Sequence, residues 1–203
     1  MEELKRRRLS DARELRVLAH PLRLQILQVL HERGAATATE IAERVAESPA
    51  NCSWHLRQLA RHGFVEETGG RKGRQRPWRP TNLALEWGGS GESAETAAAS
   101  DDLSTVLMER EFGGLRAWQA WRRTDPPQWQ DAATFTQSST WLTAEELAAV
   151  NAEIGDILMR YRGRVTDPAT RPPGARLIRM FAWAVPAGPL GVPPSADDGD
   201  AGA

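Results

Sequence analysis

The sequence has little of what secreted proteins, membrane proteins and many metal-dependent enzymes require. Its 203 residues include one cysteine and four histidines. A single thiol, Cys52, cannot form an internal disulfide, as expected of a protein in a reducing cytosol. No apolar run approaches the roughly 20 residues of a membrane span. The charged N-terminus has no apolar stretch behind it, unlike a secretory signal. We therefore expect a cytoplasmic protein that makes no use of a membrane.

Histidine is missing from most of the chain. His20, His31, His55 and His62 all precede residue 63. We find no plausible set of nucleophile and base, no phosphate-binding loop and no metal motif. The sequence therefore predicts that the protein is not an enzyme and needs no cofactor.

The chain as a whole lacks an excess of either charge, because its formal net charge is −1. The charge is nevertheless unevenly divided. Residues 1–81 carry a net charge of +6, whereas residues 82–203 carry −7. This split indicates that only the front part of the chain meets a polyanion such as nucleic acid.

Apolar periodicity and capping signals predict four helices in the front part of the chain. The first two cover 10–18 and 20–33, separated at His20-Pro21 because proline is tolerated in a first helical turn. Thr37 and Glu40 have the spacing of a capping box and predict a helix over 38–45. Ser48-Pro49 begins a helix that runs to about residue 62 and stops at Gly63.

A hairpin is expected directly after these helices. Residues 64–67 are typical of a strand, residues 69–74 of a turn-rich loop, and residues 76–81 of a returning edge strand. Helices followed by a hairpin with a basic tip form the winged helix-turn-helix arrangement. We predict this DNA-binding domain over 10–81, preceded by an N-terminal arm at 1–9.

The remainder is expected to be smaller and of mixed structure. Gly, Ser and Ala predict a linker over 82–100. A long helix at 101–123, a strand at 135–142, a capped helix from Thr143 to about Arg162 and a last strand at 175–185 would form a dimerisation or effector region over 101–185. Residues 186–203 have the composition of a disordered tail. The predicted class is α+β: a mainly helical winged helix-turn-helix domain followed by a smaller helical or α+β C-terminal region.

The helix at 48–62 has two faces of different chemistry. Cys52, Leu56, Leu59 and Ala60 share the side expected to face the core. The opposite side carries groups that can read base edges, since amides pair with adenine, guanidinium groups with guanine, and apolar surface with the thymine methyl. With Ser53 added, the predicted recognition residues are Asn51, Ser53, Trp54, His55, Gln58 and Arg61. An ordinary amphipathic helix with a polar outer face is the alternative.

Five cations follow within nine residues at the predicted hairpin tip: Arg71, Lys72, Arg74, Arg76 and Arg79. Such a cluster repels itself unless phosphates neutralise it. A solvated basic loop is the alternative, but the cluster follows the candidate recognition helix directly. We predict that Arg71, Lys72, Arg74 and Arg76 contact DNA from the wing.

The front part resembles the arsenical-resistance-type (ArsR) family of bacterial winged-helix repressors over about residues 11–81. The matching segments are Leu18–Leu27, Glu40–Ala42, Ser53–Leu59 and Gly63–Val65. The resemblance implies a homodimer with the helix at 48–62 in the major groove and the wing on the backbone or in the minor groove. It also implies repression that ends when an effector binds.

The chain departs from the metal sensors of that family. Many members carry a Cys-x-Cys pair on the helix before the recognition helix, whereas this chain has Thr-Glu-Ile-Ala-Glu-Arg-Val at that place. Others use histidines on a late helix, and here none follows His62. Carboxylates alone are poor partners for soft metals. We therefore expect no metal site, and we expect Cys52 to be an inert core residue.

Tryptophans dominate the aromatic content after residue 100. Trp118 and Trp121 lie one turn apart on the predicted long helix, and Trp129, Trp141 and Trp183 follow. Packing in a core or a dimer interface is the favoured interpretation. An aromatic-lined pocket for a small-molecule effector is the alternative.

Together these observations predict a sequence-specific transcription regulator that binds double-stranded DNA. We expect a dimeric repressor on a palindromic operator that does not sense metals. The competing hypothesis is a winged helix that serves only as a protein-interaction module.

Overall fold

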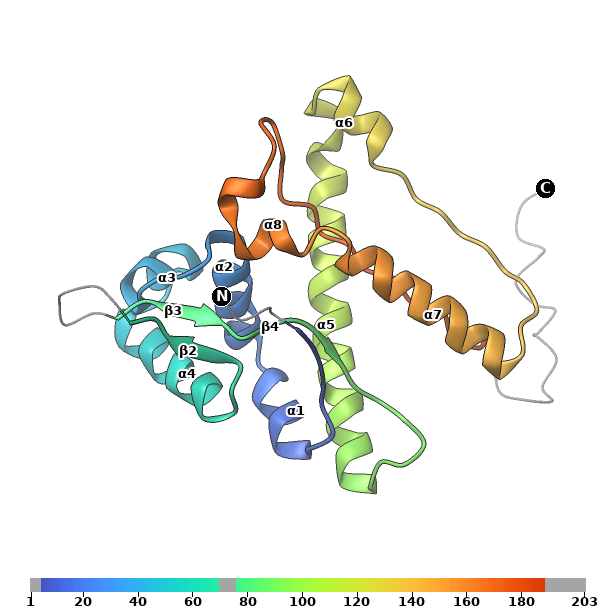
Figure 1. Cartoon of the computed structure of the whole chain (residues 1–203), viewed down its shortest axis with the longest axis horizontal. Coiled ribbons are helices and arrows are strands. Elements are labelled where there is room, and N and C mark those ends of the chain that lie inside the picture. The colour runs from blue at the N-terminus through green and yellow to red at the C-terminus, as the bar shows by residue number, and fades with distance from the viewer. Residues whose placement is uncertain (1–4, 70–75, 189–203) are drawn as a thin grey trace. The chain divides into compact units, whose positions relative to one another are not determined.

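The computed structural model describes residues 5–69 and 76–188 of the chain. It divides into two units, one formed by Met1–Thr134 with Tyr161–Leu177, the other by Phe135–Arg160 with Ile178–Ala203. Figure 1 shows the elements in chain order. The winged helix lies in the first unit.

Helices α1 (Ala12–Leu18) and α2 (Pro21–Arg33) are separated where the sequence predicted. His20 is the N-cap of α2, its ring Nδ1 accepts a hydrogen bond from the Leu22 amide at 3.2 Å, and Pro21 follows in the first turn. Helix α2 ends at Gly34, whose φ of +82° suits a residue without a Cβ. The predicted ends of α2 are therefore confirmed.

Helices α3 (Ala38–Val45) and α4 (Pro49–Arg61) form the helix-turn-helix. Thr37 and Glu40 make both hydrogen bonds of the predicted capping box. The turn passes through Ala46, which has a left-handed φ of 55°, and the Ser48 hydroxyl then caps α4 by accepting from the Asn51 amide at 3.1 Å. Gly63 follows α4 with a φ of +69°. Both predicted helices are confirmed to within a residue.

The wing is built from strands β2 (Val65–Glu67) and β3 (Trp78–Pro80), which pair antiparallel. An isolated bridge joins Ala36 to Trp78, so the hairpin is also fastened to the chain just before α3. The strands are shorter than the predicted 64–67 and 76–81. Residues 70–75, which include most of the predicted basic tip, lie outside the described part of the chain.

The linker expected over 82–100 has regular structure at both ends, whereas residues 87–93 between them have no helix or strand. Strand β4 (Asn82–Glu86) pairs in parallel with β1 (Lys5–Arg8), so part of the expected arm is also a strand. Helix α5 (Ala94–Trp121) begins seven residues earlier than expected, because the Ser93 hydroxyl caps it by accepting from the Thr96 amide. Small residues at this point allow close packing, since Ala99 and Ser100 are buried.

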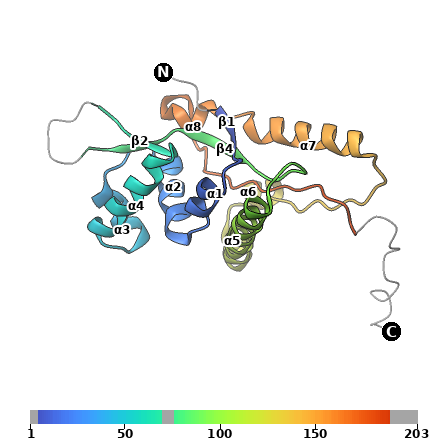
Figure 2. The same cartoon turned by 90° about the horizontal axis from the view of Figure 1, so that it is seen from below.

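The core lies among α1–α4, the base of the wing and the first turns of α5. Helix α1 packs beside α5, as both views of the fold show (Figures 1 and 2). Leu103 of α5 is fully buried with side chains from the front part of the chain. The winged helix therefore needs α5 to complete its core. The largest fully buried residues are Leu9, Leu15, Leu18, Ile26, Leu30, Ile41, Leu56, Leu59 and Leu103.

The rest of the first unit is helical where it is regular. A 3₁₀ turn η1 (Arg122–Thr124) follows α5 and leads to α6 (Pro127–Ala132). After the segment assigned to the second unit come α8 (Gly163–Thr166) and the 3₁₀ turn η2 (Pro168–Thr170). Residues 171–177 have no helix or strand.

The second unit contains α7 (Ala144–Met159), which begins with the predicted Thr143–Glu146 capping box. The strands predicted at 135–142 and 175–185 are not formed. Their patterns were suitable, but a strand needs a neighbour to satisfy its backbone, and neither segment pairs with one. The described part of 101–185 is therefore helical rather than α+β. None of the described helices combines the length and apolarity that crossing a membrane requires.

Candidate nucleic-acid interface

The outward face of α4 is rotated relative to the predicted one. Cys52, His55, Leu56 and Leu59 are the buried residues of the helix. Since residues four and three apart share a helix face, the exposed side is centred on Trp54, Arg57 and Arg61. Trp54 and Arg61 thus point outward as predicted. Asn51, Ser53 and Gln58 lie at the margins of this face and are half-buried.

His55 is not on the outer face, contrary to the sequence prediction. Its side chain is only 4 % exposed. Its Nδ1 accepts a hydrogen bond from Nε of Arg23 at 3.2 Å, and its ring centroid lies 4.7 Å from that of His20. Burial, followed by the nearby His20 and Arg23, lowers the pKa of His55. A neutral imidazole with a hydrogen-bond partner can be buried, which is why treating histidine as a polar surface residue failed here.

Trp54 is exposed but held in place from behind. Its indole meets the His55 ring edge-on with centroids 4.7 Å apart, and Cζ of Arg23 lies 5.7 Å from the indole centroid. Arg23 is itself anchored, since its Nη1 donates to the carbonyl of Val17 at 2.8 Å. The indole remains 46 % exposed. These contacts restrict the positions that the Trp54 side chain can adopt, so its exposed indole is a large apolar surface in a defined place.

Arg57 is an exposed residue of this face that the sequence analysis missed. Its Nη1 donates to the Ser53 hydroxyl at 2.7 Å, which lays the guanidinium along the N-terminal half of α4. The sequence spacing could have identified it, because Arg57 follows Trp54 by three residues and precedes Arg61 by four, which places all three on one helix face. Assigning His55 to the outer face and Ala60 to the core moved the predicted centre of the face away from Arg57.

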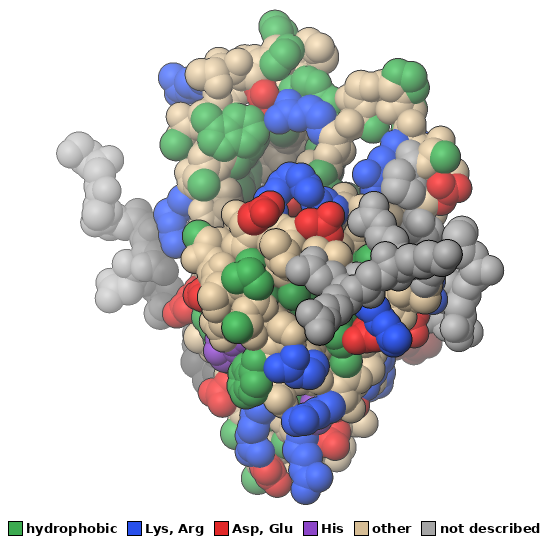
Figure 3. Space-filling view, turned by 90° about the vertical axis from the view of Figure 1, so that its left-hand side faces the viewer, with side chains coloured by type: hydrophobic (Ala, Val, Ile, Leu, Met, Phe, Trp, Pro, Cys, Tyr) green, Lys and Arg blue, Asp and Glu red, His purple; other side chains and the backbone are tan. Residues whose placement is uncertain are grey.

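An open groove runs between α4 and the wing. Its lining includes Ala38 and Thr39 of α3, Ser53 and Arg57 of α4, and Arg76 of the wing. Figure 3 looks onto this side of the molecule and shows basic side chains interspersed with acidic ones. The first turn of α3, the outer face of α4 and the base of the wing therefore form one continuous surface.

Two of the five cations of the basic wing cluster, Arg76 and Arg79, lie in the described part of the chain. Arg71, Lys72 and Arg74 lie outside the described residues. Arg76 pairs with Glu67 at 3.1 Å, and Arg79 pairs across the hairpin with Glu66 at 2.6 Å. At least two of the five cations therefore have carboxylate partners, and self-repulsion in the cluster is smaller than the sequence count suggested. Exposed pairs of this kind are weak enough to exchange for phosphate contacts.

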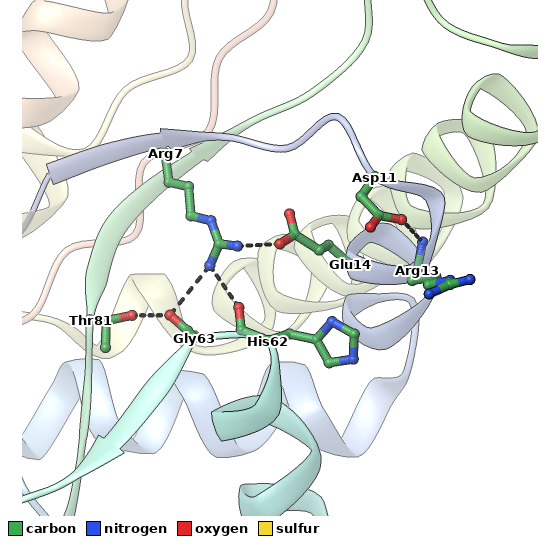
Figure 4. A network of polar contacts seen from close by, with 7 residues as sticks. All are labelled: Arg7, Asp11, Arg13, Glu14, His62, Gly63 and Thr81. Atoms are coloured by element: carbon green, nitrogen blue, oxygen red, sulfur yellow. Dashed lines mark hydrogen bonds and ion pairs between the residues drawn. The ribbon is translucent and has the colours of Figure 1, made fainter.

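The N-terminal strand supports the far end of α4 through Arg7 (Figure 4). Its Nη1 donates to the carbonyls of His62 at 2.9 Å and Gly63 at 3.3 Å. Its Nη2 pairs with Glu14 of α1, and Cζ lies 4.8 Å from the ring centroid of Phe64. The carbonyls at a helix end lack partners within the helix. Arg7 therefore fixes the C-terminal end of α4 against α1 and the start of the wing.

Cys52 is fully buried on the core face of α4, as predicted. Burial, with a smaller contribution from Glu47, raises the pKa of its thiol, which disfavours the reactive thiolate. Among the residues that the structure describes, no group of three or more His, Cys, Asp or Glu side chains is placed to hold a metal ion.

Comparison with known proteins bears on the same part of the chain. Residues 18–68 match the family model of a helix-turn-helix domain. No curated protein matches the sequence. Among solved structures, the homodimeric winged helix-turn-helix DNA-binding domain of a possible ArsR-family transcriptional regulator from Mycobacterium bovis is 23% identical. The match covers 49% of this chain and 77% of that chain, with a TM-score of 0.33.

Two further solved structures are similar at the same level. A transcriptional regulator homologue from Pyrococcus horikoshii is 23% identical over 49% of this chain and 87% of that one, with a TM-score of 0.30. ZitR of Lactococcus lactis in complex with DNA is 16% identical over 68% and 74%, with a TM-score of 0.27. These scores are too low to carry an argument about function. The matched family model, together with α2–α4 and the hairpin, identifies a winged helix-turn-helix domain.

Proposed function

We propose that this protein is a sequence-specific DNA-binding transcription regulator that represses as a homodimer. The observation that carries the proposal is the outer face of α4, where Trp54, Arg57 and Arg61 are exposed in a row and Arg57 lines the groove shared with the wing. Arginine pairs bidentately with guanine, and an apolar surface contacts the thymine methyl. The face can therefore supply base readout, while the wing supplies phosphate contacts.

The dimer part of the proposal rests on α5. Met108 and Phe112 are exposed at 42% and 38%, although both are large and apolar. With the half-buried Leu115 they recur at spacings of four and three and form a second apolar stripe, distinct from the buried one at Ala99 and Leu103. A second copy packed on this stripe would present two α4 helices to half-sites about 34–36 Å apart on one face of DNA.

We also propose that regulation does not depend on a metal ion. The thiol pair and the late histidines of metal-sensing relatives are missing from the sequence. Zinc, cadmium or arsenite at modest concentrations should then leave DNA affinity unchanged. Release of the operator by a stoichiometric amount of any of these would contradict this part of the proposal.

The decisive experiment is selection of bound fragments from random or genomic DNA, followed by affinity measurements on the selected site and on random DNA at several salt concentrations. Arg57→Gln or Arg61→Gln should cost about 1–3 kcal/mol on the selected site if the residue contacts a base, and little on random DNA. Arg13→Gln, on the exposed side of α1, is the matched control. A monomer on a site without symmetry would contradict the dimer.

The wing predicts a different pattern. Arg71→Ala and Arg74→Ala should weaken binding to both DNAs alike, and each lost phosphate contact should flatten the logarithmic salt slope by about one unit. If the α4 variants instead weakened both DNAs equally while the wing variants relaxed the sequence preference, the two assignments would be reversed. Absence of any salt-sensitive DNA binding would favour the protein-interaction module.

A further inference from the structure

We propose that Trp121, Asp125 and Trp129 form a binding site for a small organic monocation with N–H donors, such as a guanidinium or amidinium compound, and that Arg176 occupies this site in the absence of the ligand. The proposal does not depend on DNA binding. It assigns a binding role to two of the tryptophans that follow the winged helix, Trp121 and Trp129.

The guanidinium of Arg176 has the contacts of a bound ligand. Its Cζ lies 4.8 Å from the ring centroid of Trp129 and 5.8 Å from that of Trp121, both within the range of a cation–π interaction. Its Nη1 donates to Oδ1 of Asp125 at 2.9 Å. Two indole faces and one carboxylate are the groups that recognise a weakly hydrated organic cation.

The three receptor groups belong to one short continuous segment of the chain. They follow each other at intervals of four residues, from the last turn of α5 through the bend at Pro126 to α6. Nε2 of Gln130 donates to the carbonyls of Asp125 at 2.7 Å and Arg123 at 3.3 Å, which fastens the bend. The site is therefore preorganised by local contacts that do not involve Arg176.

Arg176 comes from a segment that is held loosely by comparison. It directly follows a turn closed by the Ala175 amide and the Pro172 carbonyl at 3.1 Å, with Gly174 at a φ of +78°. Residues 171–177 have no helix or strand. The Arg176 side chain is 38% exposed, and Trp121 is 42% exposed. A free cation can reach the site from solvent and replace the guanidinium without disturbing a core.

The surroundings restrict the class of ligand. Asp125 accepts a hydrogen bond from an N–H of the guanidinium, which favours N–H donors over quaternary ammonium ions, since these have no N–H to donate. Arg122 and Arg123 precede Asp125 by three and two residues in the chain and add positive charge beside the site, so a second positive charge on the ligand would be repelled. Polyamines should therefore bind poorly.

The test follows the indole N–H resonances of the full-length protein in a titration with ethylguanidinium, below the concentration at which it unfolds the chain. N-ethylurea, a neutral planar donor, and spermidine are the comparison probes. Resonances of Trp121 and Trp129, assigned with Trp→Phe variants, should shift with ethylguanidinium and not with the other two. Arg176→Gln should bind about tenfold more tightly than wild type if Arg176 fills the site about nine-tenths of the time.

Further variants in the Arg176→Gln background locate the site. Trp129→Leu and Asp125→Asn should abolish saturable binding, whereas Trp141→Leu should not, because Trp141 is a 97% exposed tryptophan elsewhere in the chain. Arg176→Lys keeps the charge and loses the planar donors, so its affinity should lie between those of wild type and Arg176→Gln. Equal affinity of wild type and Arg176→Gln, no shift of either indole, or binding that survives Trp129→Leu would each overturn the proposal.

Discussion

Helices α3 and α7 start with the same chemistry and differ in what they pack against. Each begins with a threonine whose side chain accepts a hydrogen bond from the amide three residues later. The side chain of the glutamate at that position in turn accepts a hydrogen bond from the backbone amide of the threonine. Helix α3 then buries Ile41 and Ala42, whereas none of the residues of α7 is buried. A capping box therefore defines where a helix begins, but contacts with the rest of the chain decide whether the helix contributes to a core.

The largest expected difference comes from the same substitution made in both helices. Ile41→Ala should lower the free energy of unfolding by about 2–5 kcal/mol, because it leaves a cavity at a fully buried side chain. Ile157→Ala, at a side chain that is 51% exposed, should change it by about 0.5 kcal/mol or less. Denaturant unfolding of the full-length variants measures both. Equal losses would show that α7 has a packing partner equivalent to that of α3.

The next effect concerns side-chain hydrogen bonds between a helix and another segment of the chain, made by Arg7 at the end of α4 and by Asn151 of α7. Arg7→Met keeps most of the aliphatic stem but removes the pair with Glu14 and the hydrogen bonds to the end of α4. We expect a loss of about 2 kcal/mol in the free energy of unfolding. In the second unit, Asn151→Ala removes one exposed bond to the carbonyl of Ala184 and should cost less than about 0.5 kcal/mol. A negligible effect of Arg7→Met would mean that the arm is not needed to hold α4.

Removing either threonine cap should destabilise its own helix by a similar amount, but the effect on the unfolding transition of the protein should differ. Thr37→Ala and Thr143→Ala should each destabilise their own helix by about 1 kcal/mol. For α3 this loss should appear in cooperative unfolding of the winged helix. For α7 it should appear as faster amide exchange in the first turn without a change in the main transition. Amide hydrogen exchange and denaturant unfolding on the same two variants distinguish these outcomes.

The smallest effect is a difference in pH dependence. Burial lowers the pKa of both His20 and His55, so the folded state binds fewer protons than the unfolded state as pH falls through about 6.5. Stability of the winged helix should therefore decline with acidification in that range, and less so in His55→Asn. In α7, hydrogen bonds from Thr143 lower the pKa of Glu146, so its cap should weaken only below about pH 4.3. Thermal unfolding from pH 7.5 to about 5 tests the first range, and amide exchange in the first turn of α7 from about pH 5 to 3 tests the second.

Local chemistry allowed most of the winged helix to be predicted. The ends of α2, α3 and α4 follow from His20-Pro21, Gly34, the Thr37–Glu40 box and Ser48-Pro49, all of which act over three or four residues. Predictions that depended on distant partners failed more often. The strands at 135–142 and 175–185 have suitable patterns and no pairing partner, whereas the expected linker at 82–100 contains β4 because β1 is available to pair with it.

The candidate interface divides in the same way. By itself the sequence determined that α4 exists, where it starts and stops, and that Trp54 and Arg61 share its polar side. Only the tertiary structure decided that His55 turns inward and Arg57 outward, because the partner of His55 is Arg23, 32 residues away on another helix. It also decided that Arg176 lies against Trp129. Capping and helix hydrogen bonds are settled between near neighbours in the chain, whereas the burial of a polar ring or a guanidinium depends on which distant groups the fold brings within reach.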